Sequence, residues 1–522
     1  MDLAKLLEDL PWIKLDWCFP SMTQETNELI QKCTEIPEIE PDPEVDEIIE
    51  RSKNFPIPFP IQTVRLEKLK EHRPIDRLKR NISETYPIIH ERVLLLMAHF
   101  LIYKREHGSS IEKELYRDMT IPELIDRLLL KRAVSFMGAR DAYMLMSGKK
   151  GVDGWENVGT PAETEPLVLK DVLSYDEIKL SAFLFVSGPT ECINSGSRRN
   201  CGVLDDDDIE KEAIIIGAIG PRFKRLNRMD YEDMVISKTQ NTAERGYGEH
   251  EAPTRCMDVL RHAYTRDASL AKRAWRQLWA ELYQVHSYTY EELSARLAGA
   301  ASDRYVKLPR GGAWFDNEVY YKRICILAET VLLEAEGRAR GRSVFLNVVG
   351  CGLGVWKISP HQTDVYVLTF LERIRAMLDE EALDHITDVN FAYIGTSKSV
   401  TALFADRSED KESAAKIMFL KNERHPKGGV SVQLEDREPA SRLHGRHRGK
   451  LLVLTYPWDG NAQPGNEFWK GKLKSSGDPA AACSTQVAEL HNPHVNPRAA
   501  SRTARVAARD AVLPLRTYAG RR

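Results

Sequence analysis

Alternation of apolar strands with amphipathic helices over residues 210–495 most constrains the fold of this chain. The stretch EAIIIGAIGPRF, from Glu212 to Phe223, is typical of a buried strand that ends in a Gly-Pro turn. A long helix (YYKRICILAETVLLEAEGRAR), a strand (VFLNVV), a second helix (TDVYVLTFLERIRAML) and two more strands (HITDVNFAYI and GKLLVLTYPWDGN) follow it. This order predicts an α/β fold, in which helices cover the faces of a sheet.

The segments outside the alternating region have other patterns. Residues 1–74 are acidic and interrupted by prolines, which predicts an arm without a long helix. Residues 75–150 have apolar side chains at helical spacing, which predicts a helical lobe. Residues 497–522 contain seven Arg and one Asp, which predicts a basic, frayed tail. The region between, 151–496, is expected to carry the function, with a helical insertion at 255–305 and a polar surface insertion at 405–447.

Charge and cysteine usage argue against several classes of protein. Lys and Arg total 74 against 77 Asp and Glu, a net charge of −3, which argues against a nucleic-acid binder and against adsorption to an anionic membrane. No run approaches 18 apolar residues, so no membrane span is expected. The eight cysteines are scattered without C-x-x-C spacing, so neither a zinc site nor a redox motif is indicated. With no signal peptide recognisable at the N-terminus, a cytoplasmic location is expected.

The first candidate for chemistry is the glycine-rich turn GCGLGVW at 350–356, between a strand and a helix. Glycines allow backbone N–H groups to approach an anion, and a following helix adds its positive N-terminal end. Gly350, Gly352 and Gly354 are therefore candidates for binding a diphosphate. The turn lacks the GK[ST] of a Walker motif and the third glycine of GxGxxG. A tight turn without a ligand stays the alternative.

The second candidate is the loop YPWDGNAQPGNEFWKGKLKSSGDPAAA at 456–482, which follows a buried strand. Loops with many hydrogen-bonding side chains that emerge from a buried strand often carry function. Asn and Asp also form turns for purely local reasons, which is the alternative here. The polar and glycine residues of interest are Asp459, Asn461, Gly465, Asn466, Glu467, Gly477 and Asp478.

Together these segments resemble macrodomains, which bind ADP-ribose. IIIGAIGPRF is similar to the Val-Gly-Pro strand of that fold, VFLNVVGCGLGVW to its phosphate loop, and LLVLTYPWDGN with PGNEFWKGK to its ribose strand and loop. HITDVNF is similar to the strand whose Asp binds adenine, which puts Asp388 at that position. Because the order of these parts is rotated, the resemblance implies a circularly permuted macrodomain-like three-layer core with an added helical N-terminal lobe.

A more specific resemblance covers residues 130–496, about 70% of the chain. SFMGARDAYML, GWENVGT, LSYDEIKLSA, PTECINSGSRRNCG, IGPRF, LPRGGAWFDNEVYYKR, VVGCGLGVWK and WDGNAQPGNEFWKGKLKSSGDPAAACST are similar to the MavL-like family of ADP-ribosyl hydrolases. This implies removal of ADP-ribose from a modified protein, with arginine as the linkage of the bacterial member and ubiquitin-related proteins among the possible substrates. The tail after Asn496 does not resemble the family.

The resemblance also implies the site residues. Acids of the last loops, here Asp459, Glu467 and Asp478, are the expected catalytic residues; the middle one is Asp in the bacterial member. Hydrolysis at the anomeric carbon needs one carboxylate to activate water and another to hold the ribose or assist the leaving group, and it needs no metal ion or cofactor. A non-catalytic ADP-ribose reader and a scaffold with an inactive pocket are the alternatives. The ligand-binding residues expected are Gly350, Gly352, Gly354, Trp356, Asp388, Asn461, Gly465, Asn466 and Gly477, with Trp469 as another ring that could stack.

Overall fold

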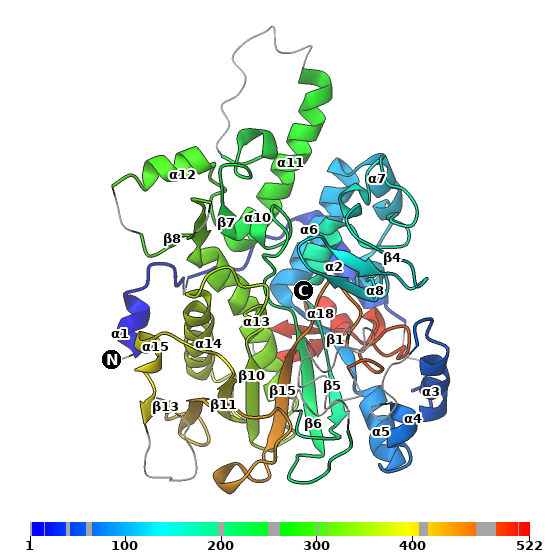
Figure 1. The fold of residues 1–522 in the computed structure, drawn as a ribbon, viewed down its shortest axis with the longest axis vertical. Coiled ribbons are helices and arrows are strands. Elements are labelled where there is room, and N and C mark those ends of the chain that lie inside the picture. The colour runs from blue at the N-terminus through cyan, green and yellow to red at the C-terminus, as the bar shows by residue number, and fades with distance from the viewer. Residues whose placement is uncertain are drawn as a thin grey trace.

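The computed structural model describes residues 3–14, 16–37, 42–58, 65–196, 203–248, 262–299, 302–309, 311–406, 416–465, 487–509 and 511–522. In these residues a mixed eleven-stranded sheet runs through the molecule in the order β12-β13-β14-β11-β10-β15-β6-β5-β1-β16-β17 (Figure 1). The α/β fold predicted from the alternating pattern is confirmed. Two small sheets, β2-β3-β4 and β7-β9-β8, lie outside the main sheet.

The five central strands of the main sheet all run parallel. Most of their side chains are buried on both faces, as expected for parallel strands that helices cover from both sides; every residue of β11 is buried, for example. These strands are β14 (Gly429–Leu434), β11 (Ile386–Ala392), β10 (Val344–Val349), β15 (Leu451–Pro457) and β6 (Glu212–Ala218).

Mostly antiparallel strands extend the sheet at both sides. On the β14 side lie β13 (Lys416–Lys421) and β12 (Ala405–Asp406); on the β6 side lie β5 (Leu184–Glu191), β1 (Tyr86–His90), β16 (Arg505–Ala508) and β17 (Ala511–Pro514). The small sheets consist of β2 (Ser135–Met137), β3 (Ala142–Met144) and β4 (Lys150–Gly151), and of β7 (Val235–Ile236), β8 (Tyr305–Lys307) and β9 (Trp314–Asp316).

Two long helices, α13 (Asn317–Gly337) and α14 (Gln362–Asp379), pack against each other, and α13 contacts β1, β6 and β10 (Figure 1). Helix α13 begins where the Asp316 carboxylate accepts the backbone N–H groups of Glu318 and Val319, which satisfies two free donors of its first turn. The other helices are α1 (Leu3–Glu8), α2 (Gln24–Gln31), α3 (Val45–Lys53), α4 (Leu66–Leu69), α5 (Ile75–Ser83), α6 (Glu91–His107), α7 (Ser110–Tyr116), α8 (Ile121–Leu130), α9 (Tyr175–Ser181), α10 (Tyr231–Met234), α11 (His262–Tyr283), α12 (Tyr290–Arg296), α15 (Lys398–Thr401) and α18 (Leu515–Arg521). None of the helices in the described ranges is long and apolar enough to cross a membrane.

The C-terminal segment is folded, so the prediction of a frayed tail over 497–522 is wrong. Strand β16 pairs in parallel with β1, and Val506 and Ala507 are fully buried. Strand β17 and helix α18 follow, and Arg522 forms an ion pair with Glu91. The many arginines of this segment suggested that it is exposed. The short apolar stretches between them instead form strands that pair with β1 and with each other.

The 405–447 region also differs from the surface insertion that was predicted. Strand β14 belongs to the parallel block, and its Val430 and Val432 are fully buried. In the N-terminal part, the helices expected over 75–150 are present, but β1 lies among them in sequence and joins the main sheet. In the described part of residues 1–74 the helices α1 to α4 are short, and they bury Leu29 and Ile48.

Candidate active site

The loops that follow β6, β10 and β15 meet at one edge of the sheet. These three strands are parallel, so their carboxyl ends lie side by side, which is where open α/β sheets bind ligands. The loops after β6 and β10 touch through their backbones: a Cβ on Gly220 would lie 2.2 Å from the carbonyl of Cys351. The loop after β15 is tied to β6 by a hydrogen bond of 3.0 Å from Trp458 N to Ala218 O.

The three glycines of the 350–356 turn have different surroundings. Gly352 has a φ of +79°, and a Cβ there would lie 2.8 Å from Pro221 O, so backbone packing alone requires glycine at this position. A Cβ on Gly350 would lie 2.9 Å from the Leu353 side chain. Among the described residues, no heavy atom lies within 4 Å of the Cβ position of Gly354. Gly354 is therefore the one of the three that faces open space in this part of the chain.

Asp459 lies two residues beyond the end of β15. Its Oδ1 accepts hydrogen bonds from Asn461, at 3.4 Å from the backbone N and 3.2 Å from Nδ2. Its side chain is partly accessible, but protein atoms surround it, and this burial raises the pKa of the carboxyl above its usual value. Arg222 opposes the rise in pKa, and Asp141 adds to it. The structure therefore brings the predicted residues Asp459 and Asn461 together.

Arg222 and Asp141 are not among the site residues predicted from the sequence, although both lie in segments that resemble the family. Arg222 follows the Gly-Pro turn and is buried; its Nη2 donates to Asp141 Oδ1 over 2.8 Å, and its backbone N donates to Asp230 over 2.9 Å. Its Nε is buried and has no hydrogen-bond partner among the residues that the structure describes. Asp141 is also buried, in a left-handed conformation (φ 51°), and accepts a hydrogen bond from Tyr175. A charged residue within the otherwise apolar stretches SFMGARDAYML and IGPRF is the sequence feature that could have indicated a role for each.

A second buried arginine, Arg132, interacts electrostatically with Asp459. Its guanidinium carbon lies 4.0 Å from the centre of the Trp458 ring, and its Nη2 donates to Ser181 O over 3.1 Å. Burial lowers the pKa of Arg132 to about 9. The backbone N of Gln463 donates to Ala133 O over 2.8 Å, which fixes the loop after β15 beside this arginine.

Trp356 and Gly465 have distinct places in the site. Trp356 is partly buried, and the Arg222 guanidinium carbon lies 5.7 Å from the centre of its ring. Gly465 is buried and has a φ of 71°. The predicted residues Asn466, Glu467, Trp469, Gly477 and Asp478 lie outside the described residues.

Asp388 does not join the other predicted site residues. It pairs in register with Phe345 near the start of β10, whereas the glycine turn follows Val349. Four residues of strand separate the two levels, about 13 Å. Asp388 instead forms an ion pair with Lys450, and its Oδ1 lies 3.3 Å from Nδ1 of His447. Burial alone would raise its pKa, but hydrogen bonds from His447, Lys450 and Thr387 lower it to about 2. The structure therefore sets Asp388 apart from the diphosphate turn, and its expected place at the adenine stays a prediction.

Tyr393, which the sequence analysis missed, lies at the carboxyl end of β11 instead. It directly follows Ala392, the register partner of Val349, and so it lies beside the start of the glycine turn. Its side chain is 56% exposed, and its φ is 57°. Its backbone N donates to Asp436 Oδ1 over 2.8 Å. An exposed aromatic ring in a strained backbone conformation at a loop cluster is a feature of functional sites.

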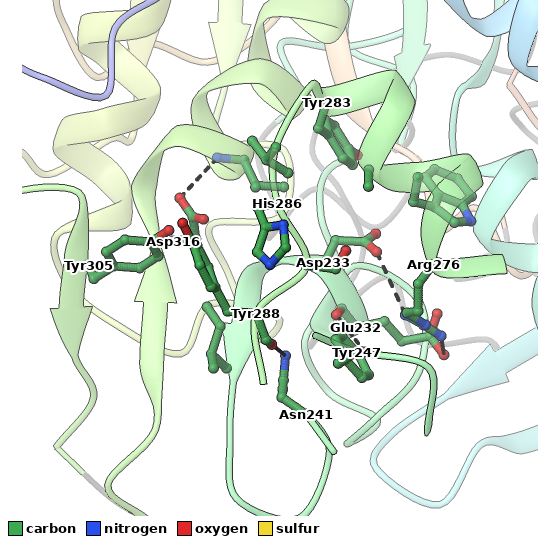
Figure 2. Close-up of a pocket in the computed structure, with 16 residues that line it drawn as sticks. Glu232, Asp233, Asn241, Tyr247, Arg276, Tyr283, His286, Tyr288, Tyr305 and Asp316 are labelled. Carbon is green, nitrogen blue, oxygen red and sulfur yellow. Dashed lines mark hydrogen bonds and ion pairs between the residues drawn. The ribbon is translucent and has the colours of Figure 1, made fainter. Parts of the chain in front are cut away.

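Two cavities elsewhere contain none of the predicted site residues. The first lies between α10, the end of α11 and β8–β9; Glu232, Asp233, Tyr247 and Arg276 line one side, with Tyr305 and Asp316 on the other and His286 between them (Figure 2). Its volume of about 30 Å³ holds only one or two water molecules. The second, about 700 Å³, lies between α6, α11 and residues 20–23. In the described part of the chain, no group of three or more His, Cys, Asp or Glu could hold a metal ion.

Comparison with known proteins is consistent with this geometry. A family model described as "ADP-ribosylhydrolase MavL-like" matches residues 46–521. The chain is 40% identical over 475 residues to ADP-ribosylarginine hydrolase CG3568 of Drosophila melanogaster. The aligned region covers 90% of this chain and 87% of that protein. It is 36% identical over 497 residues to ADP-ribosylarginine hydrolase CG2909 of the same organism, covering 94% and 91%. The match to the family model includes the C-terminal strands, which the sequence analysis left outside its resemblance.

Proposed function

The chain belongs to the MavL-like ADP-ribosylhydrolase family, and we propose that it releases ADP-ribose from modified arginine through carboxylates, without a metal ion. The enzyme class, an ADP-ribosylarginine hydrolase, follows from the family and from two relatives that cover most of the chain. The loops at the carboxyl edge of β6, β10 and β15 are the proposed site. Arg222 and Arg132 supply positive charge there.

The setting of Asp459 carries this proposal. A carboxylate whose pKa is raised by burial is a stronger base than an ordinary aspartate, and it can take a proton from the water that attacks the anomeric carbon. The bond from that carbon to the guanidine nitrogen breaks with its electron pair going to nitrogen, and the proton returns to the released arginine. Arg222 favours the ionised form of Asp459 and so keeps the base available. In this proposal Asn461, which donates hydrogen bonds to Asp459, also contacts the ribose.

The proposed fold is a circularly permuted macrodomain. Strand β15 comes after β6 and β10 in the chain, yet it lies between them in the sheet. The strand expected to carry the ribose loop is therefore a direct neighbour of the strand with the phosphate loop, despite the rotated order. This neighbourhood supports the proposal, because one ligand can then contact Gly354 and Asn461 together.

For the adenine end of the ligand we propose Tyr393 in place of Asp388. Tyr393 is exposed at the same edge as Gly354, whereas Asp388 lies near the amino ends of the strands. Stacking of a base on an aromatic side chain is worth about 1–3 kcal/mol, so one exposed tyrosine can contribute substantially to affinity.

The proposal is tested with a panel of mono-ADP-ribosylated substrates. Peptides modified on arginine, serine and glutamate, together with ubiquitin modified on arginine, are incubated with the full-length protein, and released ADP-ribose is measured with and without EDTA. We expect release from arginine in both conditions. Binding of ADP-ribose without release from any substrate would make the protein a reader, and loss of release with EDTA would contradict the metal-free mechanism.

A further inference from the structure

The loop after β6 and the glycine turn after β10 form two walls that touch at their base and separate toward the surface. They touch where Gly220 meets Cys351 and where Gly352 meets Pro221 O. They separate at Gly354, whose Cβ position is open, and Val355 is 76% exposed. The proposed diphosphate would therefore lie over Gly354 and Val355.

Lys224 reaches from the first wall to the second. Its Nζ lies 3.4 Å from the carbonyl oxygen of Val355, and its side chain is exposed. Among the described residues it has no carboxylate within ion-pair distance. Its neighbour Arg225, by contrast, lies 3.4–3.7 Å from the carboxylates of Asp141, Asp153 and Glu156. In the described ranges, the polar group that contacts the Lys224 ammonium at the open part of the turn is thus the Val355 carbonyl.

We propose that Lys224 binds the diphosphate of ADP-ribose from the wall opposite Gly354. This inference rests on the proposed function and adds to it a residue that distinguishes nucleotides with a diphosphate from nucleosides. A lysine ammonium is a compact charge on a flexible chain, suited to phosphate oxygens whose position is set by other contacts. On the same wall, the guanidinium groups of Arg222 and Arg225 are paired with carboxylates, whereas in the described part of the chain the Lys224 ammonium is not.

The test compares Lys224→Met with wild type by calorimetry, using ADP-ribose, ADP and adenosine as ligands. We expect about fivefold weaker binding of ADP-ribose and ADP, the size of an exposed ion pair, and no change for adenosine. Lys224→Arg should keep most of the affinity. Raising the salt concentration should weaken ADP-ribose binding to wild type more than to Lys224→Met, because the lost interaction is one that salt screens.

Lys427→Met is the matched control. Lys427 is equally exposed, but it lies in the turn between β13 and β14, at the opposite edge of the sheet, so its loss should leave all three affinities unchanged. One outcome is that Lys224→Met binds ADP-ribose and ADP with wild-type affinity while wild type still hydrolyses ADP-ribosylarginine. That result would overturn the role of Lys224 and leave the proposed function standing. Equal weakening for adenosine would also overturn it. Absence of ADP-ribose binding and of hydrolysis in wild type would overturn the proposed function with it.

Discussion

Arg222 and Asp141, 81 residues apart in the chain, are joined by a hydrogen bond of 2.8 Å from Nη2 to Oδ1. Both are buried, and both influence the carboxyl of Asp459 electrostatically, in opposite directions. The pair connects the loop before β3 with the loop after β6, so the segment SFMGARDAYML, outside the alternating region, contributes to the site.

Substitution of Asp141 should change the pH dependence of activity. Asp459 acts as a base only when ionised, so activity is lost as the pH falls through its pKa. Burial raises that pKa, and the negative charge of Asp141 raises it further. Asp141→Asn should therefore move the acidic limb of the kcat/KM profile to lower pH. Asp153→Asn, whose carboxylate faces Arg225 and Arg140, is the control and should leave the limb in place. A limb that moves upward in Asp141→Asn would contradict the role of Asp459.

Valine at Gly354 and valine at Gly352 should have different effects. At Gly354 the added side chain enters open space, so we expect lost ADP-ribose binding with an unchanged thermal midpoint. At Gly352 the positive φ and the contact with Pro221 O make a Cβ unfavourable, at about 1–2 kcal/mol for the conformation alone. We expect a lower midpoint there. Calorimetry and thermal unfolding monitored by circular dichroism separate the two, and full binding by Gly354→Val would remove the turn from the ligand site.

Asp388→Asn should reduce stability and leave ADP-ribose affinity unchanged. Its carboxylate is buried and accepts hydrogen bonds from Lys450 and Thr387, and the neutral amide that replaces it leaves the charge of the lysine without a counter-charge at this position. We expect a decrease of about 1–3 kcal/mol in the free energy of unfolding, measured by urea denaturation. Weaker binding at unchanged stability would restore the original assignment of Asp388 to the adenine.

Tyr393→Ala should weaken ADP-ribose binding about fivefold or more through loss of stacking. The side chain is exposed, so the thermal midpoint should change little. Tyr393→Trp keeps a ring in the same place and is expected to bind as well as wild type. Unchanged affinity of the alanine variant in calorimetry would mean that adenine lies elsewhere.

The sequence predicts local features of this fold well because they depend on neighbouring residues. The strand, turn and helix around Gly350 follow from periodicity and glycine content, and so does the loop carrying Asp459 and Asn461. The places of Asp388, Arg222 and Asp141 depend on strand register and on contacts between distant segments, which local patterns do not encode. The place of Asp388 at the adenine is predicted from the likeness of its strand, whereas the parallel register with β10 sets it near the amino ends of the strands.

The C-terminal strand shows a related limit. Its arginines suggested exposure, but the pairing of Val506 with Ile89 on β1 decides its structure. A short strand of this kind gains its stability from a partner that lies more than 400 residues away. The composition of the segment is dominated by its arginines, so it does not indicate that the apolar residues between them form a buried strand.

The central claim is that Asp459 is the base that activates water. Its most direct test is to measure, for Asp459→Asn, both the rate of ADP-ribose release from an arginine-modified peptide and the affinity for ADP-ribose. The substitution keeps the size of the side chain and removes the base. We predict a rate about 10²-fold lower or more, with affinity within about tenfold of wild type. Wild-type release by this variant would contradict the account, and an equal loss of binding and turnover would make Asp459 a residue that only holds the ribose.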